Sequence, residues 1–303
     1  MVHKEFGAWL QAELGCRAQK ISVDAGFSCP NRDGTVGHGG CTFCDNRAFS
    51  PAYCRQGGTV TGQLEAGKRF FAHKYPTLKY LAYFQSYTST HASLERLKAL
   101  YEEALRVPDV MGLVIGTRPD CMPVPLLDYL EELSHRTFLL VEYGVESASE
   151  DTLRRINRGH TFAQAEDTIR GTAARGIRTG AHMILGFPWE SHAELMRQAR
   201  VMARLPLTTL KLHQLQVIRG TELARQYAAH PWPTPTAEEY VDLVLEYISR
   251  LPSTLVLERF VSQSPSEYVI APRWGLKNHE FAALVRKRMN RHPTDMPNAQ
   301  GHG

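Results

Sequence analysis

The chain has 303 residues, 43% of them hydrophobic and 22% charged, with a formal charge of +4 at pH 7. This composition is typical of a soluble globular protein with a sizeable core, and the mild basic excess permits an anionic partner without requiring one. No stretch approaches the roughly 18 apolar residues that cross a membrane, and the first residues lack the apolar core of a signal peptide, so we expect a cytoplasmic protein with no membrane partner.

An amphipathic helix is expected in residues 1–18, and short β-rich runs then alternate with helical segments. Such alternation is typical of parallel βαβ units. The expected strands cover 20–24, 80–86, 112–116, 138–145, 178–185 and 209–216. The expected helices between them cover 61–73, 94–105, 125–134, 161–175 and 191–205.

Six β/α units form either a partial barrel or an open doubly wound sheet. The glycines after the first strand do not follow the G-x-G-x-x-G pattern of nucleotide-binding open sheets, so we favour a partial (β/α)6 TIM-type barrel over residues 19–217. A small α+β extension over 218–292 follows, with helices near 222–229, 237–250 and 278–291. Residues 293–303 lack apolar anchors and are expected to be disordered.

Three cysteines, Cys29, Cys41 and Cys44, lie on the Gly-, Pro- and Asn-rich loop after the first strand. Barrel enzymes place their active sites at this end of the strands, and thiolates are the usual ligands of Fe–S clusters. Three ligands would leave one iron of a four-iron cluster open. Two alternatives are a structural zinc site completed by His38 or Cys54, and a redox pair formed by Cys41 and Cys44.

Five stretches of the chain resemble the radical S-adenosylmethionine (SAM) superfamily, specifically its YhcC-like (YtqA-like) family, which is related to the radical SAM part of the Elongator catalytic subunit. They are SVDAGFSCPNRDGTVGHGGCTFC (22–44), YFQSYTST (83–90), GTRPDC (116–121), VEYGVESASEDTLRRINRGHT (141–161) and GAHMILGFPWE (180–190). Their order along the barrel is the one expected of this superfamily.

The resemblance implies that the three cysteines hold a [4Fe–4S] cluster and that SAM chelates its fourth iron. An electron, from a donor such as flavodoxin or ferredoxin, then cleaves SAM to a 5′-deoxyadenosyl radical. The C-x11-C-x2-C spacing is wider than the superfamily's common C-x3-C-x2-C but agrees with this branch. No acetyltransferase-like domain follows the barrel, so the Elongator reaction does not transfer whole.

Candidate SAM contacts lie at strand ends: Gln85, Ser86, Glu146 and Gly186. Strand alternation also turns Glu142 and His182 toward the barrel interior, where they either serve the site or form a satisfied polar pair. Arg118 either holds an anionic group or caps the barrel through a salt bridge. On the sixth strand either His213 with Lys211 or Gln214 with Gln216 faces inward, and this register is open. The roles of Cys54 and Cys121 are open as well.

Basic residues cluster at Arg154, Arg155 and Arg158, and again at Arg286, Lys287, Arg288 and Arg291. If both clusters lay beside the barrel mouth they would form a phosphate-binding surface, although solvated helix faces explain such runs equally well. With the Elongator resemblance, the pattern favours tRNA and a C5 substituent of a modified wobble uridine. The alternatives are a small-molecule or protein substrate, and a non-enzymatic RNA-binding protein with structural zinc.

Overall fold

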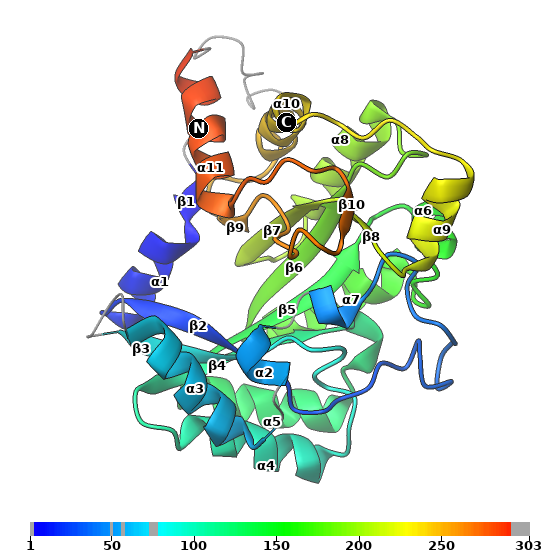
Figure 1. Cartoon of the computed structure of the whole chain (residues 1–303). Coiled ribbons are helices and arrows are strands. Elements are labelled where there is room, and N and C mark those ends of the chain that lie inside the picture. Colours follow the sequence, from blue (N-terminus) through cyan, green and yellow to red (C-terminus); the bar gives the residue numbers. More distant parts are fainter. Residues whose placement is uncertain (1–2, 49–50, 56–57, 73–77, 292–303) are drawn as a thin grey trace.

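One large parallel sheet organises the molecule, as Figure 1 shows for the computed structural model, which describes residues 3–48, 51–55, 58–72 and 78–291. The strand order is β1-β9-β7-β6-β5-β4-β3-β2, and every neighbouring pair is parallel. The strands are β1 (Lys4–Glu5), β2 (Ala18–Val23), β3 (Lys79–Phe84), β4 (Val110–Thr117), β5 (Phe138–Glu146), β6 (Arg178–Leu185), β7 (Thr209–Gln214) and β9 (Val256–Arg259). The sheet curls into a half-barrel, which confirms the predicted fold class.

Helices surround this sheet, and several of them pack on its outer face. The helices are α2 (Ala52–Arg55), α3 (Val60–Ala72), α4 (Leu94–Leu105), α5 (Val124–Ser134), α6 (Glu150–Arg155), α7 (Phe162–Ala174), α8 (His192–Met202), α9 (Glu222–Ala229), α10 (Ala237–Ile248) and α11 (Asn278–Arg291), with α1 (Phe6–Leu14) before β2. Ser or Thr side chains cap the first turns of several helices that follow strands, Ser93 before α4 and Thr161 before α7 among them. Within the described ranges, every helix falls short of the length and apolar character needed to span a bilayer.

The six predicted barrel strands are present, and two further strands extend the sheet. The short β1 and the C-terminal β9 pair with each other, and β9 also pairs with β7. The extension after residue 217 therefore contributes one strand to the barrel wall, together with a small antiparallel pair, β8 (Val217–Ile218) and β10 (Val269–Ala271). The expected disordered tail, 293–303, lies outside the described residues.

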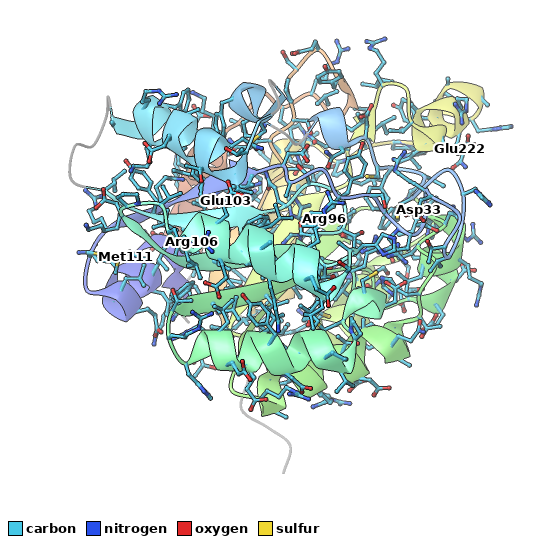
Figure 2. All side chains as sticks on the ribbon, turned by 90° about the horizontal axis from the view of Figure 1, so that it is seen from below. Asp33, Arg96, Glu103, Arg106, Met111 and Glu222 are labelled. Atoms are coloured by element: carbon cyan, nitrogen blue, oxygen red, sulfur yellow. The ribbon has the colours of Figure 1, made fainter. Side chains whose placement is uncertain are left out.

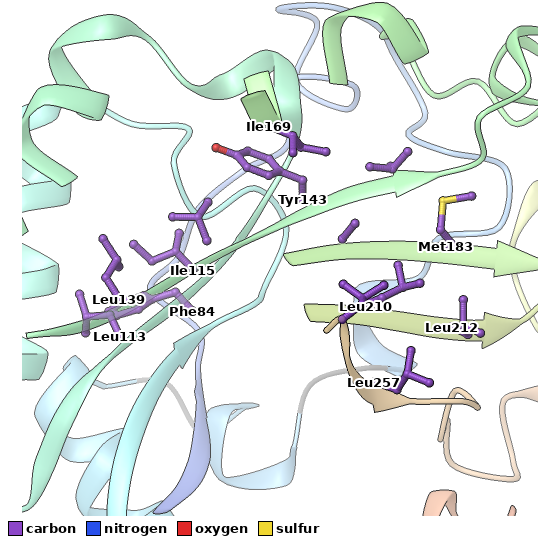
Figure 3. Packing of buried hydrophobic residues seen from close by; sticks show 14 of the residues in the cluster. Phe84, Leu113, Ile115, Leu139, Tyr143, Ile169, Met183, Leu210, Leu212 and Leu257 are labelled. Carbon is purple, nitrogen blue, oxygen red and sulfur yellow. The ribbon is translucent and has the colours of Figure 1, made fainter. Parts of the chain in front are cut away.

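Alternation along each strand separates the outer core from the barrel interior. On β5, Leu139, Val141 and Tyr143 belong to the main hydrophobic core between the sheet and the helices. Figure 3 shows part of that core, where Phe84, Leu113 and Ile115 from neighbouring strands lie side by side with Leu139 and Tyr143. The intervening residues of β5 face the interior.

The lower end of the barrel interior is closed by α1. Trp9 and Leu10 of this helix pack on inward-facing apolar residues of the strands, including Leu81, Val114 and Leu140. The helix contacts both β2 and β9, so it bridges the two sides of the incomplete barrel. Helix α1 thus forms an apolar floor at the end where the strands begin, and the cysteine loop lies at the other end.

Candidate active site

The cysteine loop lies at the end of the molecule where the strands finish. Figure 2 shows Asp33 of this loop on the opposite side of the molecule from Met111, which lies at the start of β4. The loop is held by backbone hydrogen bonds, Arg32 N to Cys29 O at 2.7 Å and Cys44 N to Cys41 O at 3.0 Å. A further bond from Thr42 N to Ile156 O, at 2.9 Å, joins it to the segment after α6.

Cys29, Cys41 and Cys44 are all free thiols, and all three line one cavity of about 1330 Å³. Cys41 is buried, and burial together with the neighbouring Cys41 sulfur raises the pKa of Cys44 to about 11. A volume of this size exceeds that of a pocket for one drug-sized ligand. The sequence prediction that these three side chains share one site therefore agrees with the geometry.

Two side chains that the sequence analysis did not assign here contact the cysteines. Arg158 Nη1 lies 3.4 Å from Cys41 Sγ, and Asn31 Nδ2 lies 3.7 Å from the same sulfur. Arg32 Nη2 donates to the carbonyl of Cys44 at 2.6 Å. Hydrogen bonds to cysteine sulfur and a net positive surround stabilise thiolates and tune Fe–S clusters, so the donor set fits a cluster held by three thiolates.

The position of Arg158 corrects the sequence analysis, which placed this residue in an exposed basic cluster. It is only 7% exposed. Helix α6 ends at Arg155, and Asn157 adopts a left-handed conformation with φ of 52°, so the chain turns and directs the next side chain into the barrel. Burial works to lower the pKa of Arg158, but the Cys41 thiolate and Glu146 outweigh it and hold that pKa above its usual value.

Glu146 occupies the end of β5 in a strained conformation. Its φ is 70°, and the pairing of β5 with β6 is irregular between Gly144 and Glu146. A Cβ on Gly144 would lie 2.6 Å from Glu146 Oε1 and 2.7 Å from Arg158 Nη2, so only glycine leaves room for both groups. Strained residues of this kind cluster at functional sites, and Glu146 lines the cavity beside the cysteines.

The other candidate SAM contacts lie at neighbouring strand ends. Gln85 lines the cavity and donates from Nε2 to Ser22 Oγ at 2.7 Å, whereas Ser86 is buried, with 3% of its surface exposed. Gly186 follows β6 with φ of 101°, and open space surrounds the position of a Cβ there. These four contacts remain predictions.

Arg118 combines the two roles considered for it. Its guanidinium forms a bidentate pair with Asp120, with Nε at 2.9 Å and Nη2 at 2.7 Å from the carboxylate oxygens. It also lines the cavity, and its buried Nη1 has no hydrogen-bond partner among the described residues. Arg158 Nε is in the same situation. Buried donors of this kind fit an anionic group such as the SAM carboxylate.

A network of buried charges crosses the barrel below the cysteines. Glu142 accepts from Lys20 at 2.7 Å, from Lys211 at 2.5 Å and from His182 at 3.1 Å. The second acid, Glu258, lies 2.8 Å from Lys20 and 3.1 Å from Lys211. Glu142 and His182 thus form the satisfied polar pair that was one of the two expectations for them.

Leu210 and Leu212 of β7 belong to the outer core, so the alternate residues Lys211 and His213 face the barrel interior. Both line the cavity, and the His213 ring lies 5.6 Å from the His182 ring. Burial, with His182, Arg259 and Lys211 nearby, lowers the pKa of His213 well below its usual value, so this imidazole is neutral at pH 7.

Cys54, Cys121 and His38 each have surroundings of their own. Cys54 donates its thiol to Ser22 O at 3.2 Å, and burial with Asp24 nearby raises its pKa to about 12. Burial likewise raises the pKa of Cys121 to about 12. His38 is exposed at the edge of the loop. In the described part of the chain no three His, Cys, Asp or Glu side chains converge on a single-ion site; a four-iron cluster spreads its thiolates more widely.

The two basic clusters do not form one surface. Arg154 and Arg155 pair with Asp151 on α6, whereas Arg286 and Arg288 of α11 pair with Glu5 and Asp242. Figure 1 shows α6 and α11 on opposite sides of the molecule. The side chain of Arg291 lies outside the described residues. Of the two explanations considered for these basic runs, the ion pairs and the separation of α6 and α11 favour solvated helix faces.

Comparison with known proteins places this arrangement in context. The chain is 35% identical over 280 residues to the uncharacterized protein YtqA of Bacillus subtilis, covering 92% of this chain and 87% of that protein. It is 34% identical over 274 residues to protein YhcC of Escherichia coli, covering 89% and 86%. Elongator complex protein 3 of Saccharomyces cerevisiae is 28% identical over 59% of this chain and 32% of its own length.

Solved structures share the fold. The archaeal Methanocaldococcus infernus Elp3, with an N-terminal deletion, superposes with a TM-score of 0.67 at 17% identity, covering 92% of this chain and 64% of that one. Residues 207–291 match the Radical_SAM C-terminal domain, which includes β9. Residues 33–200, more than half of the chain, match the Radical SAM superfamily. The family match and the YtqA and YhcC relatives together establish that this chain belongs to the radical SAM superfamily.

Proposed function

We propose that the chain is a radical SAM enzyme that acts on the C5 substituent of a modified wobble uridine in tRNA. The radical SAM part of this proposal rests on three free cysteines that lie on one loop and line one cavity, at the end of the half-barrel where the strands finish. When bound, a [4Fe–4S] cluster and SAM supply reductive cleavage of SAM to methionine and a 5′-deoxyadenosyl radical that abstracts hydrogen. The family membership implies both groups.

The chain's own residues would bind the cluster, orient SAM and shield the radical. Cys29, Cys41 and Cys44 supply the thiolates, and Arg158 donates toward the Cys41 sulfur. The unpartnered N–H groups of Arg118 and Arg158 suit the SAM carboxylate. The apolar contacts of α1 with the strands cover one end of the barrel, and such cover would help to shield a reactive radical from solvent.

The tRNA substrate is supported by resemblance and by cavity size. Elongator complex protein 3 shares the region that contains the barrel strands, and the cavity, about 1330 Å³, has room for a second ligand beside SAM. A base turned out of an anticodon loop would enter such a cavity, while the RNA backbone stays outside. A small-molecule or protein substrate is the competing outcome of the tests below.

Anaerobic reconstitution tests the cofactor. We expect a brown protein with about four irons per chain, and we expect Cys41→Ala to lose cluster content and reductive SAM cleavage. The matched control is Cys16→Ala, which removes a thiol outside the cysteine loop. Cluster and SAM cleavage that survive intact in Cys41→Ala would contradict the assignment.

The substrate is tested separately. We expect bulk tRNA to stimulate 5′-deoxyadenosine formation by the wild-type enzyme, and we expect nucleoside mass spectrometry of a deletion strain to show an altered wobble-uridine profile. A normal cluster with no stimulation and an unchanged profile would rule out tRNA and leave radical SAM chemistry on another substrate.

A further inference from the structure

A β-bulge in the last barrel strand directs two consecutive side chains into the cavity. The partner of Leu257 is Leu210 and that of Arg259 is Lys211, so Glu258 is the extra residue on β9. In a regular strand Glu258 and Arg259 would face opposite sides of the sheet. Both line the cavity instead, and redirecting a side chain is a common use of bulges beside active sites.

Arg259 faces the cavity without an acidic partner. Among the described residues its guanidinium makes no hydrogen bond or ion pair. Both acids of the barrel network, Glu142 and Glu258, are already engaged by Lys20 and Lys211. Three cations therefore face two carboxylates, and the layer has one positive charge in excess.

The surroundings of Arg259 are electropositive as well. His213 faces the cavity, and its buried Nε2 has no partner among the described residues. Burial and then the positive charges of His182, Arg259 and Lys211 keep the pKa of His213 low, so the ring adds no counter-charge. Arg259 is itself partly exposed to this cavity, so its guanidinium is free to pair with an anion that enters.

Strand register places Arg259 three strands along the barrel wall from Gly144 of β5. Arg259 pairs with Lys211, Lys211 with His182, and His182 with Gly144. The Gly144 carbonyl accepts a hydrogen bond from Arg158, which also contacts Cys41. Three inter-strand spacings, about 14 Å along the curved wall, separate the two sides of this layer. The same cavity is lined by Arg158 at one end of this path and by Arg259 at the other.

We propose that Arg259 binds a carboxylate carried by the substrate, and thereby positions the substituent on which the enzyme acts. The inference rests on the proposed function, since it needs a base inside the barrel. A carboxylate suits a guanidinium because the two planar groups form paired hydrogen bonds. A backbone phosphate is less suitable, because Arg259 lies inside the barrel, level with the buried Lys211, while the RNA backbone stays at the mouth.

The test is a double-mutant cycle on binding. Reconstituted enzyme with SAM is titrated with two fluorescent anticodon stem-loops, one carrying 5-carboxymethylaminomethyluridine at the wobble position and one carrying 5-aminomethyluridine. The proteins are wild type, Arg259→Gln, Arg259→Lys and the control Arg200→Gln. Arg200 is exposed on α8, so the control removes the same charge elsewhere. Iron content and Tm establish that each variant is folded and loaded.

We expect wild type and Arg200→Gln to bind the carboxylated stem-loop about ten- to hundredfold more tightly than the other, the usual effect of a charge-assisted pair. Arg259→Gln loses this preference, and Arg259→Lys retains part of it. If Arg259→Gln still binds the carboxylated stem-loop more tightly, the proposed role of Arg259 is wrong, while the tRNA substrate is unaffected. An equal loss for both stem-loops also refutes this role, because Arg259 would then contact phosphate. If wild type binds neither stem-loop, the tRNA substrate and the anchor both fail.

Discussion

The buried Glu142 allows a quantitative test of the barrel interior. Its carboxylate holds Lys20, Lys211 and His182, and only 1% of its surface is exposed. Glu142→Gln keeps the shape of the side chain and removes its charge. The two lysines are then left with Glu258 as their only remaining acid in this network.

Breaking one side of a buried ion pair costs about 3–5 kcal/mol, because the partner charge stays buried without compensation. Glu258 still provides one counter-charge, so we expect the lower end, about 3 kcal/mol in the free energy of unfolding. For a protein of this size that corresponds to a fall in Tm of about 5–10 °C. Urea denaturation followed by circular dichroism measures the difference at neutral pH.

The pH dependence has a definite sign. Burial would raise the pKa of Glu142, but Lys20 and Lys211 hold it well below its usual value of 4.5. A carboxylate with a lowered pKa in the folded state stabilises the protein above the unfolded-state pKa, and this contribution disappears as the pH falls through the folded-state value. The deficit of Glu142→Gln is therefore constant near neutrality and shrinks below about pH 4.5.

A matched control is Glu246→Gln on α10, where the carboxylate pairs with Arg250 and His192 at the surface. An exposed pair contributes below about 1 kcal/mol, so this variant should unfold almost like wild type. The reasoning is refuted if Glu142→Gln loses no more stability than the control. A deficit that persists unchanged in acid would refute the electrostatic explanation while leaving the packing intact.

Three further predictions follow from single contacts. Gly67→Ala should lower the free energy of unfolding by about 1–3 kcal/mol, because a Cβ at this position would lie 2.3 Å from Ile21 Cγ2. The control is Gly171→Ala on α7, where the position of a Cβ is surrounded by open space, so denaturant titrations should show no loss of stability. Arg158→Gln should make the midpoint potential of the cluster about 20–40 mV more negative, because the lost N–H···S hydrogen bond, worth roughly 0.5–1 kcal/mol, favours the reduced cluster. A redox titration monitored by EPR measures this shift. An unchanged potential would show that Arg158 does not act on the cluster. Cys54→Ser should retain full iron content, because Cys54 bonds to Ser22 rather than to the site, and a loss of iron would reinstate it as a ligand.

The barrel was predictable because its signals are local. The predicted strands are short segments rich in β-branched or other apolar residues, and α4 and α7 begin after a Ser or Thr that caps the first turn. The cysteine site was equally local, since all three thiols lie on one loop. The prediction that Arg158 is exposed was wrong. If the helix continued past Arg155, Arg158 would lie on its exposed face with Arg154. The observed helix ends at Arg155, and the chain turns inward at Asn157.

Pairing between distant strands explains what could not be predicted. The inward face of β7 depends on its register with β6 and β9, which no single strand specifies. The bulge on β9 is a sharper case, because one extra residue reverses the face that alternation assigns to everything after it. Regular alternation would place Glu258 and Arg259 on opposite faces of the sheet, so the interior charge network would contain Glu258 without the arginine. The observed register instead leaves one guanidinium unmatched in the cavity, which is why the proposed anchor becomes visible only once the strands are assembled.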